Sequence, residues 1–380
     1  MIRRNRATPN GLAAIKGRLG SSPEQAHRIV SAARKTLHKQ DVERLVQWIL
    51  EREHISNRVA TFTPTTFSDL FATQQLTPLA LEEELVWTTQ ILLSRESLLK
   101  SYVSVSNGYY RLALLEEHEL ASQALDHIDE QFGVSVWSLG QRIALLQNWK
   151  GLERQKQYAK SFWSSDAQPL TKLVAYLISA RTEPSTTQHG FVAWMNRFFA
   201  DLDWSGPLPD YLREVAAPAA FIQPRVAALK LVFSVSASVV DAYHALANAA
   251  GPLLIDGAAP VQDVIADHVI PLMQRCGDRR CSLAGHLLSP SDAPLNTAAA
   301  EAAAALFSGN PQRAASEALQ ILDVDPLDHD AWTIAAYGCA ELSTDPEGQF
   351  KSMQKSAIQM AKLIRGGSPT DKAAEDINKL

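Results

Sequence analysis

Two cysteines and two histidines between residues 268 and 286 are the side chains best suited to hold a metal. Cys276 and Cys281 are separated by four residues, with His268 before them and His286 after them. Thiolates and imidazoles at similar spacings bind zinc in structural sites. The stretch between the cysteines is charged, however, and no Cys-x-x-Cys pair accompanies it. We therefore predict a loop with two free thiols, and neither a bound metal nor a cofactor.

A second polar cluster, Glu116, Glu117, His118 and Glu119, could serve acid–base chemistry or hold a cation. We interpret it instead as a solvated turn before a helix. Acidic side chains are stabilising there, because their negative charge interacts favourably with the positive N-terminal end of the helix dipole. The sequence also lacks a glycine-rich phosphate loop, a Gly-x-Ser-x-Gly elbow and a His-Glu-x-x-His helix. These absences favour a non-enzymatic protein, and they leave open a catalytic site assembled from scattered residues.

The first 40 residues are basic. They contain nine lysines and arginines against one acid, Glu24, so they carry a net charge of +8 while the remainder of the chain carries −13. Arg3, Arg4 and Arg6 precede Pro9 and Gly11, which indicates a flexible lead-in over residues 1–20. Such an arm could neutralise phosphates. It could also dock on a protein, or remain a solvated tail.

Aromatic residues gather between residues 191 and 199. Trp194 and Phe198 lie four residues apart, with Phe191 and Phe199 beside them. This spacing is typical of a helix that packs an apolar face into a core. Where such a face is exposed, it can anchor a partner, because tryptophan dominates many binding interfaces. Trp194 is therefore a candidate partner-binding residue.

Composition indicates a folded protein that has no membrane span. The 380 residues are 46% hydrophobic and 20% charged, as in globular proteins. The longest apolar segment, 231–240, is far below the ~20 residues that cross a bilayer. Three cysteines are too few and too uneven for a disulfide framework, which favours a reducing compartment. We expect a cytoplasmic protein.

Helical periodicity runs through most of the chain, and strand-like alternation is scarce. Residues 225–250 predict one long buried helix that Gly251-Pro252 would end. Breaks rich in proline and glycine suggest boundaries near residues 206 and 291. We predict an all-α fold with the lead-in at 1–20, an N-terminal helical domain at 21–205, a proline-punctuated helical region at 206–290, and a repeat region at 291–380.

The clearest pattern is helix, tight turn, helix and proline stop around residues 295–332. Ala302 and Ala314 stand where two helices would cross closely, and Gly309 stands in the turn between them. Pro326 follows the second helix, and Trp332 opens the next one. The stretch resembles the tetratricopeptide repeat, a helical hairpin of ~34 residues. Two positions depart from the repeat: Ile321 stands where a small residue is usual, and Gly348 stands where alanine is expected in the following unit.

The resemblance implies stacked helical hairpins with a divergent N-terminal helical domain. If the stacking continued along the chain, the hairpins would form an α-solenoid. Stacked hairpins expose a surface that holds a peptide or a helix of a partner. We therefore predict a non-enzymatic scaffold, adaptor or regulatory subunit that binds proteins, with Arg3, Arg4, Arg6, Trp194 and Trp332 as candidate contacts. Two alternatives are an enzyme or effector with a scattered site in the middle region, and a nucleic-acid-associated accessory protein. A small-molecule substrate is not indicated by any motif.

Overall fold

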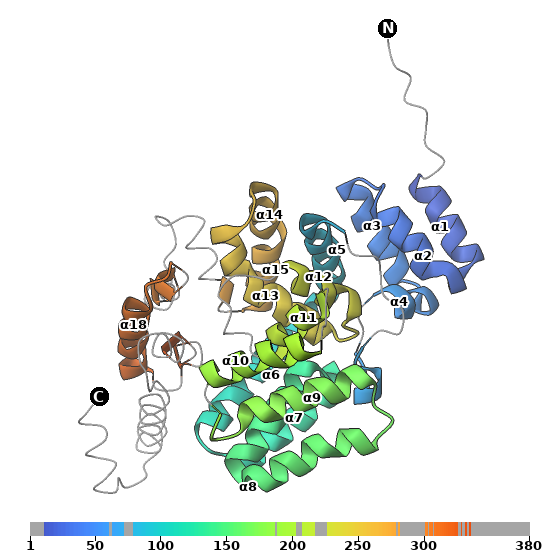
Figure 1. Cartoon of the computed structure of the whole chain (residues 1–380). Coiled ribbons are helices and arrows are strands. Elements are labelled where there is room, and N and C mark those ends of the chain that lie inside the picture. The colour runs from blue at the N-terminus through green and yellow to red at the C-terminus, as the bar shows by residue number, and fades with distance from the viewer. Residues whose placement is uncertain are drawn as a thin grey trace, which may run out of the picture.

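The chain folds into α-helices, as predicted (Figure 1). The computed structural model describes residues 11–60, 63–71, 79–186, 188–202, 207–216, 226–278, 280–281, 301–302, 304–306, 308–325, 328, 331–332 and 334–335. In this part of the chain no strand forms, and an isolated antiparallel bridge joins Phe71 to Ser236.

In chain order the elements are α1 (Leu12–Ser21), η1 (Pro23–Gln25), α2 (Ala26–Arg34), α3 (Lys39–Leu50), α4 (Glu53–Val59), η2 (Phe67–Asp69), α5 (Leu81–Leu93), α6 (Glu96–Leu114), α7 (His118–Phe132), α8 (Val136–Ser164), α9 (Pro169–Thr182), α10 (Gln188–Asp201), α11 (Pro207–Ala216), α12 (Val226–Val235), α13 (Val239–Asp256), α14 (Ala259–Val264), the π-helical turn η4 (Ile265–Val269), α15 (Ile270–Cys276) and α18 (Pro311–Val324).

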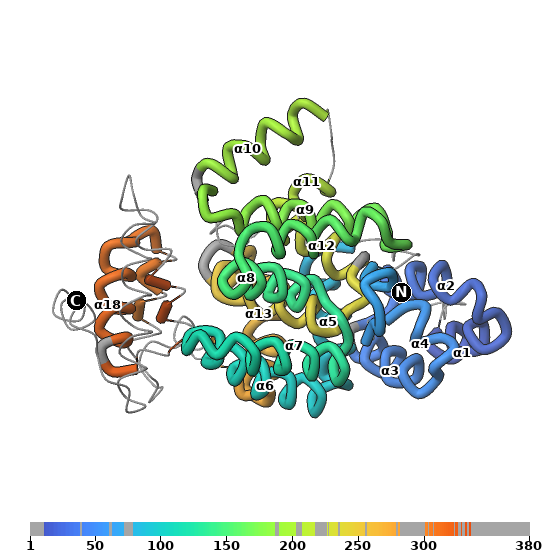
Figure 2. The backbone as a smooth tube through the Cα atoms, turned by 90° about the horizontal axis from the view of Figure 1, so that it is seen from below, coloured from blue at the N-terminus to red at the C-terminus, as the bar shows by residue number. Residues whose placement is uncertain are grey.

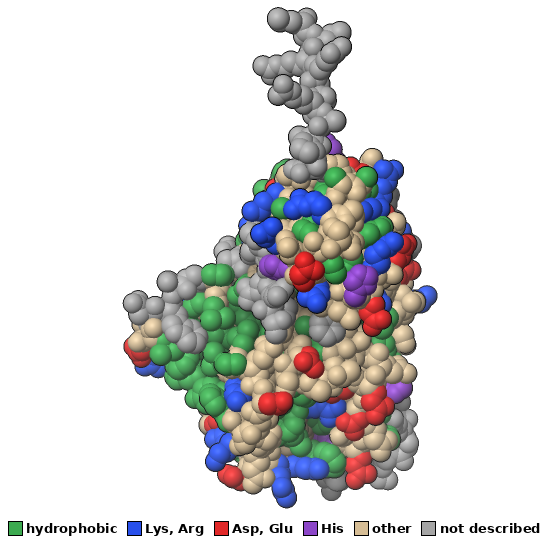
Figure 3. Space-filling model, turned by 90° about the vertical axis from the view of Figure 1, so that its right-hand side faces the viewer, with side chains coloured by type: hydrophobic (Ala, Val, Ile, Leu, Met, Phe, Trp, Pro, Cys, Tyr) green, Lys and Arg blue, Asp and Glu red, His purple; other side chains and the backbone are tan. Residues whose placement is uncertain are grey.

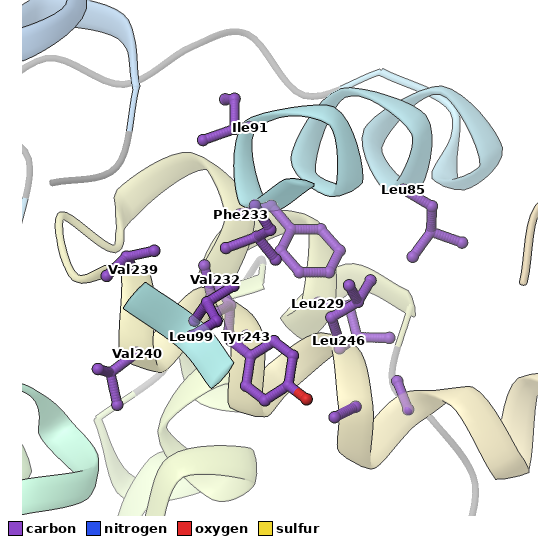
Figure 4. Close-up of a cluster of buried hydrophobic side chains, with 14 of the residues drawn as sticks. Leu85, Ile91, Leu99, Leu229, Val232, Phe233, Val239, Val240, Tyr243 and Leu246 are labelled. Carbon is purple, nitrogen blue, oxygen red and sulfur yellow. The ribbon is translucent and has the colours of Figure 1, made fainter. Parts of the chain in front are cut away.

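Helix α5 is the centre of the fold. It contacts α3 on the N-terminal side and α6, α12, α13, α14 and α15 from later in the chain. Figure 4 shows how Leu85 of α5, Phe233 of α12 and Tyr243 of α13 meet in one buried cluster. Because helices distant in sequence share this core, the middle of the chain is not a one-dimensional stack in which each hairpin touches only its neighbours.

The domain boundary predicted near residue 206 does not separate two cores. Buried side chains on both sides of it, from Ile15 to Cys276, belong to one continuous hydrophobic cluster. A second cluster of buried side chains lies between residues 302 and 335, where α18 packs against residues on either side of it. Both views place this second body at the opposite end of the molecule from α1–α4 (Figures 1 and 2). The exposed ion pair between Arg111 and Asp325, at 3.9 Å, lies where it meets α6.

Local sequence signals explain several helix ends. Ser135 caps α8, because its hydroxyl accepts the backbone N–H of Ser138 at 2.9 Å. Asn310 caps α18 in the same way through the N–H of Arg313, and Pro311 follows as the first helical residue. Within α8, Gly151 adopts φ +80° and interrupts the helix.

Two predicted segments differ from the structure. The lead-in predicted for residues 1–20 is helical from Leu12 onward, and its Ile15 and Leu19 are 3% and 0% exposed. The single helix predicted for residues 225–250 is divided into α12 and α13, because Ser238 caps a new helix by accepting the N–H of Asp241. Pro252 then lies inside α13 instead of ending it.

Candidate functional site

Helices α9 and α10 carry the most prominent aromatic surface of the described chain. In α10, Phe191, Met195 and Phe199 recur every four residues and are at most 2% exposed. Trp194 and Phe198 form a second stripe one position earlier, and they are half-buried. The helical period places the two stripes side by side on α10, one facing the core and the other at its edge.

The rings of this edge pack against one another. The centroids of Trp194 and Phe198 lie 5.4 Å apart with an interplanar angle of 22°, which is a stacked arrangement. Tyr176 of α9 meets Trp194 at 6.3 Å and 62°. Tyr176 is 42% exposed, and Leu202 beyond the end of α10 is exposed to the same degree. We call Tyr176, Trp194 and Phe198 the aromatic edge.

A polar contact lies on the opposite side of the buried stripe of α10 from the aromatic edge. The guanidinium of Arg213, from α11, lies over the ring of Phe199 at 5.0 Å. Its Nε donates to Oδ1 of Asn196 at 3.0 Å. Figure 2 shows α10 standing out from the helices beneath it, and Figure 3 shows hydrophobic side chains gathered on the flank of the molecule from which α10 projects.

The second candidate surface lies on the body formed by residues 301–335. Ala302 and Ala314 are both fully buried in its core, as expected at a close helix crossing. Gly309 adopts φ +75°, the left-handed conformation that a tight turn between helices favours in glycine. Trp332, predicted as a partner contact, is only 4% exposed and packs inside this core, so the structure assigns it a packing role. Pro326, Arg3, Arg4 and Arg6 lie outside the described residues.

The outward face of α18 is polar and slightly hollowed. Its hollow is lined by Glu301, Asn310, Gln312, Arg313, Ser316, Glu317 and Gln320. Arg313 donates from Nε to Oε1 of Glu317 at 2.6 Å and lies 4.0 Å from Glu301. The charges of this face are therefore largely paired with each other.

A partly buried polar network that no local motif indicated links α6, α8 and α13. The hydroxyl of Tyr102 lies 2.6 Å from Nε2 of His244. The indole of Trp137 stacks on the imidazole of His244 at 5.6 Å and 8°, and its Nε1 donates to the hydroxyl of Tyr110 at 2.8 Å. The contact between Tyr102 and His244 joins α6 to α13, and the bond from Trp137 to Tyr110 joins α8 to α6. The network therefore holds the three helices in register.

The cysteine stretch is tied into the core next to this network. The hydroxyl of Tyr243 donates to Asp278 at 2.7 Å, and Arg280 donates to the same carboxylate. Although burial alone would raise the pKa of Asp278, the Arg280 guanidinium lowers it to about 2. Arg280 also donates to Oδ1 of Asn248 at 2.6 Å. A charged residue between the two cysteines thus has a structural role.

Of the four residues weighed as metal ligands, the structure describes His268, Cys276 and Cys281. Cys276 is buried and Cys281 is partly exposed, and no group of three metal-binding side chains occurs among the described residues. Burial raises the pKa of the Cys276 thiol to about 11, so it is protonated near neutral pH and is a poor nucleophile. His286 lies outside the described residues.

The polar residues 116–119 span the start of α7, which begins at His118. Glu117 stands at the N-cap position of α7, and His118 stacks on Trp149 at 6.1 Å and 25°. Among the described helices, none is both long enough and apolar enough to cross a membrane. Comparison with protein-family models, with characterised proteins and with solved structures found no match.

Proposed function

We propose that this chain is a non-enzymatic scaffold, adaptor or regulatory subunit that binds a protein partner on the aromatic edge of α9 and α10. The observation that carries the proposal is a partly exposed aromatic trio: Tyr176 of α9 packs on Trp194, which stacks on Phe198, and these last two lie on α10, the helix that projects from the body (Figure 2). Tryptophan, tyrosine and arginine supply most of the energy in protein interfaces, and few other surface residues do.

The geometry of the trio supports a binding role in a second way. Stacking fixes the rings before a partner arrives, so that little side-chain entropy remains to be lost on association. The buried stripe of Phe191, Met195 and Phe199 anchors α10 to the body. A partner would therefore meet a preformed apolar surface.

We also propose that residues 291–380 form a tetratricopeptide-like region. The supporting features are the buried alanines at positions 302 and 314, the left-handed Gly309 and the capped start of α18. In this proposal the polar face of α18 is a second, weaker contact, because its charges already pair with each other. The absence of a disulfide between Cys276 and Cys281 supports a cytoplasmic setting.

Quantitative affinity purification from the cells that make the protein tests the proposal. Wild type would be compared with Trp194→Ala and with Trp163→Ala, a change of an equally large but 56% exposed tryptophan on α8. We expect at least one protein to fall about tenfold or more with Trp194→Ala and to be retained with Trp163→Ala, as loss of a hot spot requires. Equal recovery with both variants would contradict the proposal, provided that circular dichroism shows both to be folded.

A further inference from the structure

The aromatic edge continues along α10 as one apolar row. Trp194, Phe198 and Leu202 follow one another at intervals of four residues, so they lie on one side of the helix. The N–H of Leu202 donates to the carbonyl of Phe198 at 3.3 Å, so the helical path reaches this residue. Leu202 is 42% exposed, and Trp194 and Phe198 are half-buried. We call these three residues the α10 row.

A charge of each sign flanks the α10 row. Arg197 and Asp201 are both exposed, and they stand one position before Phe198 and Leu202. Neither side chain forms an ion pair or a hydrogen bond with another described residue, although the two are only one turn apart. The row therefore offers both signs of charge to a partner, and it does not select a partner that is strongly acidic or strongly basic.

The charged side chains of the neighbouring helix α9 are mostly satisfied within the chain. Arg181 donates to a backbone carbonyl of α11 at 2.7 Å, and Glu183, which follows α9, pairs with Lys156 at 3.1 Å. Lys172 is half-buried one turn before Tyr176 and has no ion pair with another described residue, so it adds a positive charge beside the aromatic edge. The charge near the row is therefore mixed.

The α10 row is complementary to a reversed copy of itself. If two copies of α10 lie antiparallel with Phe198 facing Phe198 of the second copy, Trp194 faces Leu202 of the second copy, because each is four residues from Phe198. Arg197 and Asp201 of the second copy are then offset by two residues, which is about 3 Å along the helix axis. A twofold axis forms each of these contacts twice.

We propose that the protein bound by the aromatic edge is a second copy of this chain, which packs its own α10 antiparallel against the first. The inference rests on the proposed function, because it names the partner of the same surface. Charge complementarity carries it: the twofold pair joins the exposed cation and anion of each row in two ion pairs. Helix α10 stands out from the helices beneath it, so that a second copy can approach along it (Figure 2).

Sedimentation equilibrium of the purified full chain at about 50 mM salt, where screening is weak, measures the dimer dissociation constant. We expect wild type to dimerise, and Trp194→Ala to weaken the dimer about tenfold or more. Arg197→Asp and Asp201→Arg should each weaken it by a similar factor, because each change brings like charges together. The matched control Lys160→Asp reverses a charge at an exposed position of α8 and should change little.

Mixing the two charge reversals tests the twofold contact itself. In a mixed dimer of Arg197→Asp with Asp201→Arg, both contacts again join opposite charges. We therefore expect the equimolar mixture to dimerise at least about tenfold more tightly than either variant alone. A partner other than a second copy cannot produce this recovery.

Three results, with circular dichroism showing the variants to be folded, would overturn the proposal. They are a wild type that stays monomeric up to about 100 μM, an equal dimer constant in wild type and Trp194→Ala, and a mixture no tighter than its components. The affinity purification separates this failure from failure of the proposed function. If the inference holds, the protein lost with Trp194→Ala is the untagged copy of this chain. Loss of a different protein, from a monomeric chain, would keep the aromatic edge as a binding surface and remove the second copy as its partner.

Discussion

The carboxylate of Asp241, in the first turn of α13, accepts the backbone N–H of Trp137 at 3.0 Å, in the first turn of α8. The N–H of Val136 donates to the same carboxylate at 2.8 Å. One buried side chain therefore satisfies the free donors of one helix while it stands in the first turn of another, where both helix dipoles favour negative charge. Burial nevertheless raises the pKa of Asp241 to about 7, against the opposing effect of these hydrogen bonds.

Asp241 should make stability depend on pH. Its folded pKa of about 7 lies above the ordinary 3.8, so the folded state binds the proton more tightly than the unfolded state does. The resulting stabilisation is complete below about pH 4 and is lost as pH rises to about 7, by at most about 4 kcal/mol. We expect the stability of Asp241→Asn minus that of wild type to rise across this range in denaturant titrations. A difference that stays constant with pH would contradict the assignment.

The buried ion pair of Arg34 and Glu84 ties α2 to α5. Arg34→Met should cost about 3–5 kcal/mol, because it leaves the Glu84 carboxylate buried without its partner. The double variant Arg34→Met/Glu84→Gln should recover most of that loss, since the amide can still accept the N–H of Leu79. Arg44→Met, at an exposed pair, serves as the control and should cost less than about 1 kcal/mol. Urea unfolding of the three variants measures these values, and equal costs at both sites would be the contrary result.

Helix α1 should be part of the folded core. Leu19→Ala should cost about 2–5 kcal/mol, because Leu19 is fully buried. Gly17→Ala should be neutral or stabilising by up to about 1 kcal/mol, since no neighbouring atom lies within 4 Å of an added Cβ in the helix. The midpoint of thermal unfolding should fall in Leu19→Ala and should stay the same or rise in Gly17→Ala. An unchanged midpoint in Leu19→Ala would mean that α1 is not docked in solution.

The helix crossing at Ala314 should resist a larger side chain. Ala314→Leu should overpack the crossing with Ala302 and cost roughly 1–3 kcal/mol. Ser316→Leu adds the same side chain at an exposed position of α18 and is the control. Amide hydrogen exchange across Pro311–Val324 should quicken in the first variant alone. Unchanged protection in Ala314→Leu would argue against the hairpin.

The all-α fold class could be predicted from sequence, because a helix that packs on a core repeats its apolar residues at helical spacing. Apolar residues such as Ile29, Val30 and Ala33 recur at helical spacing and are buried. The turn at Gly309 was also predicted, and this glycine adopts a positive φ. These signals act over a few residues, where backbone geometry and side-chain period alone decide the outcome.

Contacts between residues far apart in the chain could not be predicted, because no local sequence pattern indicates them. Tyr102 and His244 are 142 positions apart, and Arg34 and Glu84 are 50 apart, so only the fold brings them together. The division of residues 225–250 into α12 and α13 likewise depends on the Ser238 cap in competition with a run of apolar residues. Trp194 could be proposed as a contact from its type, but its half-buried position follows from the register of α10 against α9 and α11.

The most direct test of the central claim is site-specific photo-crosslinking in the cells that make the protein. A benzophenone amino acid would replace Tyr176, in the aromatic edge, or Trp163, an exposed residue on α8. The account predicts a discrete adduct with one partner protein from position 176, its loss when Trp194→Ala is added, and no such adduct from position 163. Adducts of equal yield and identity from both positions, or none from position 176, would contradict it.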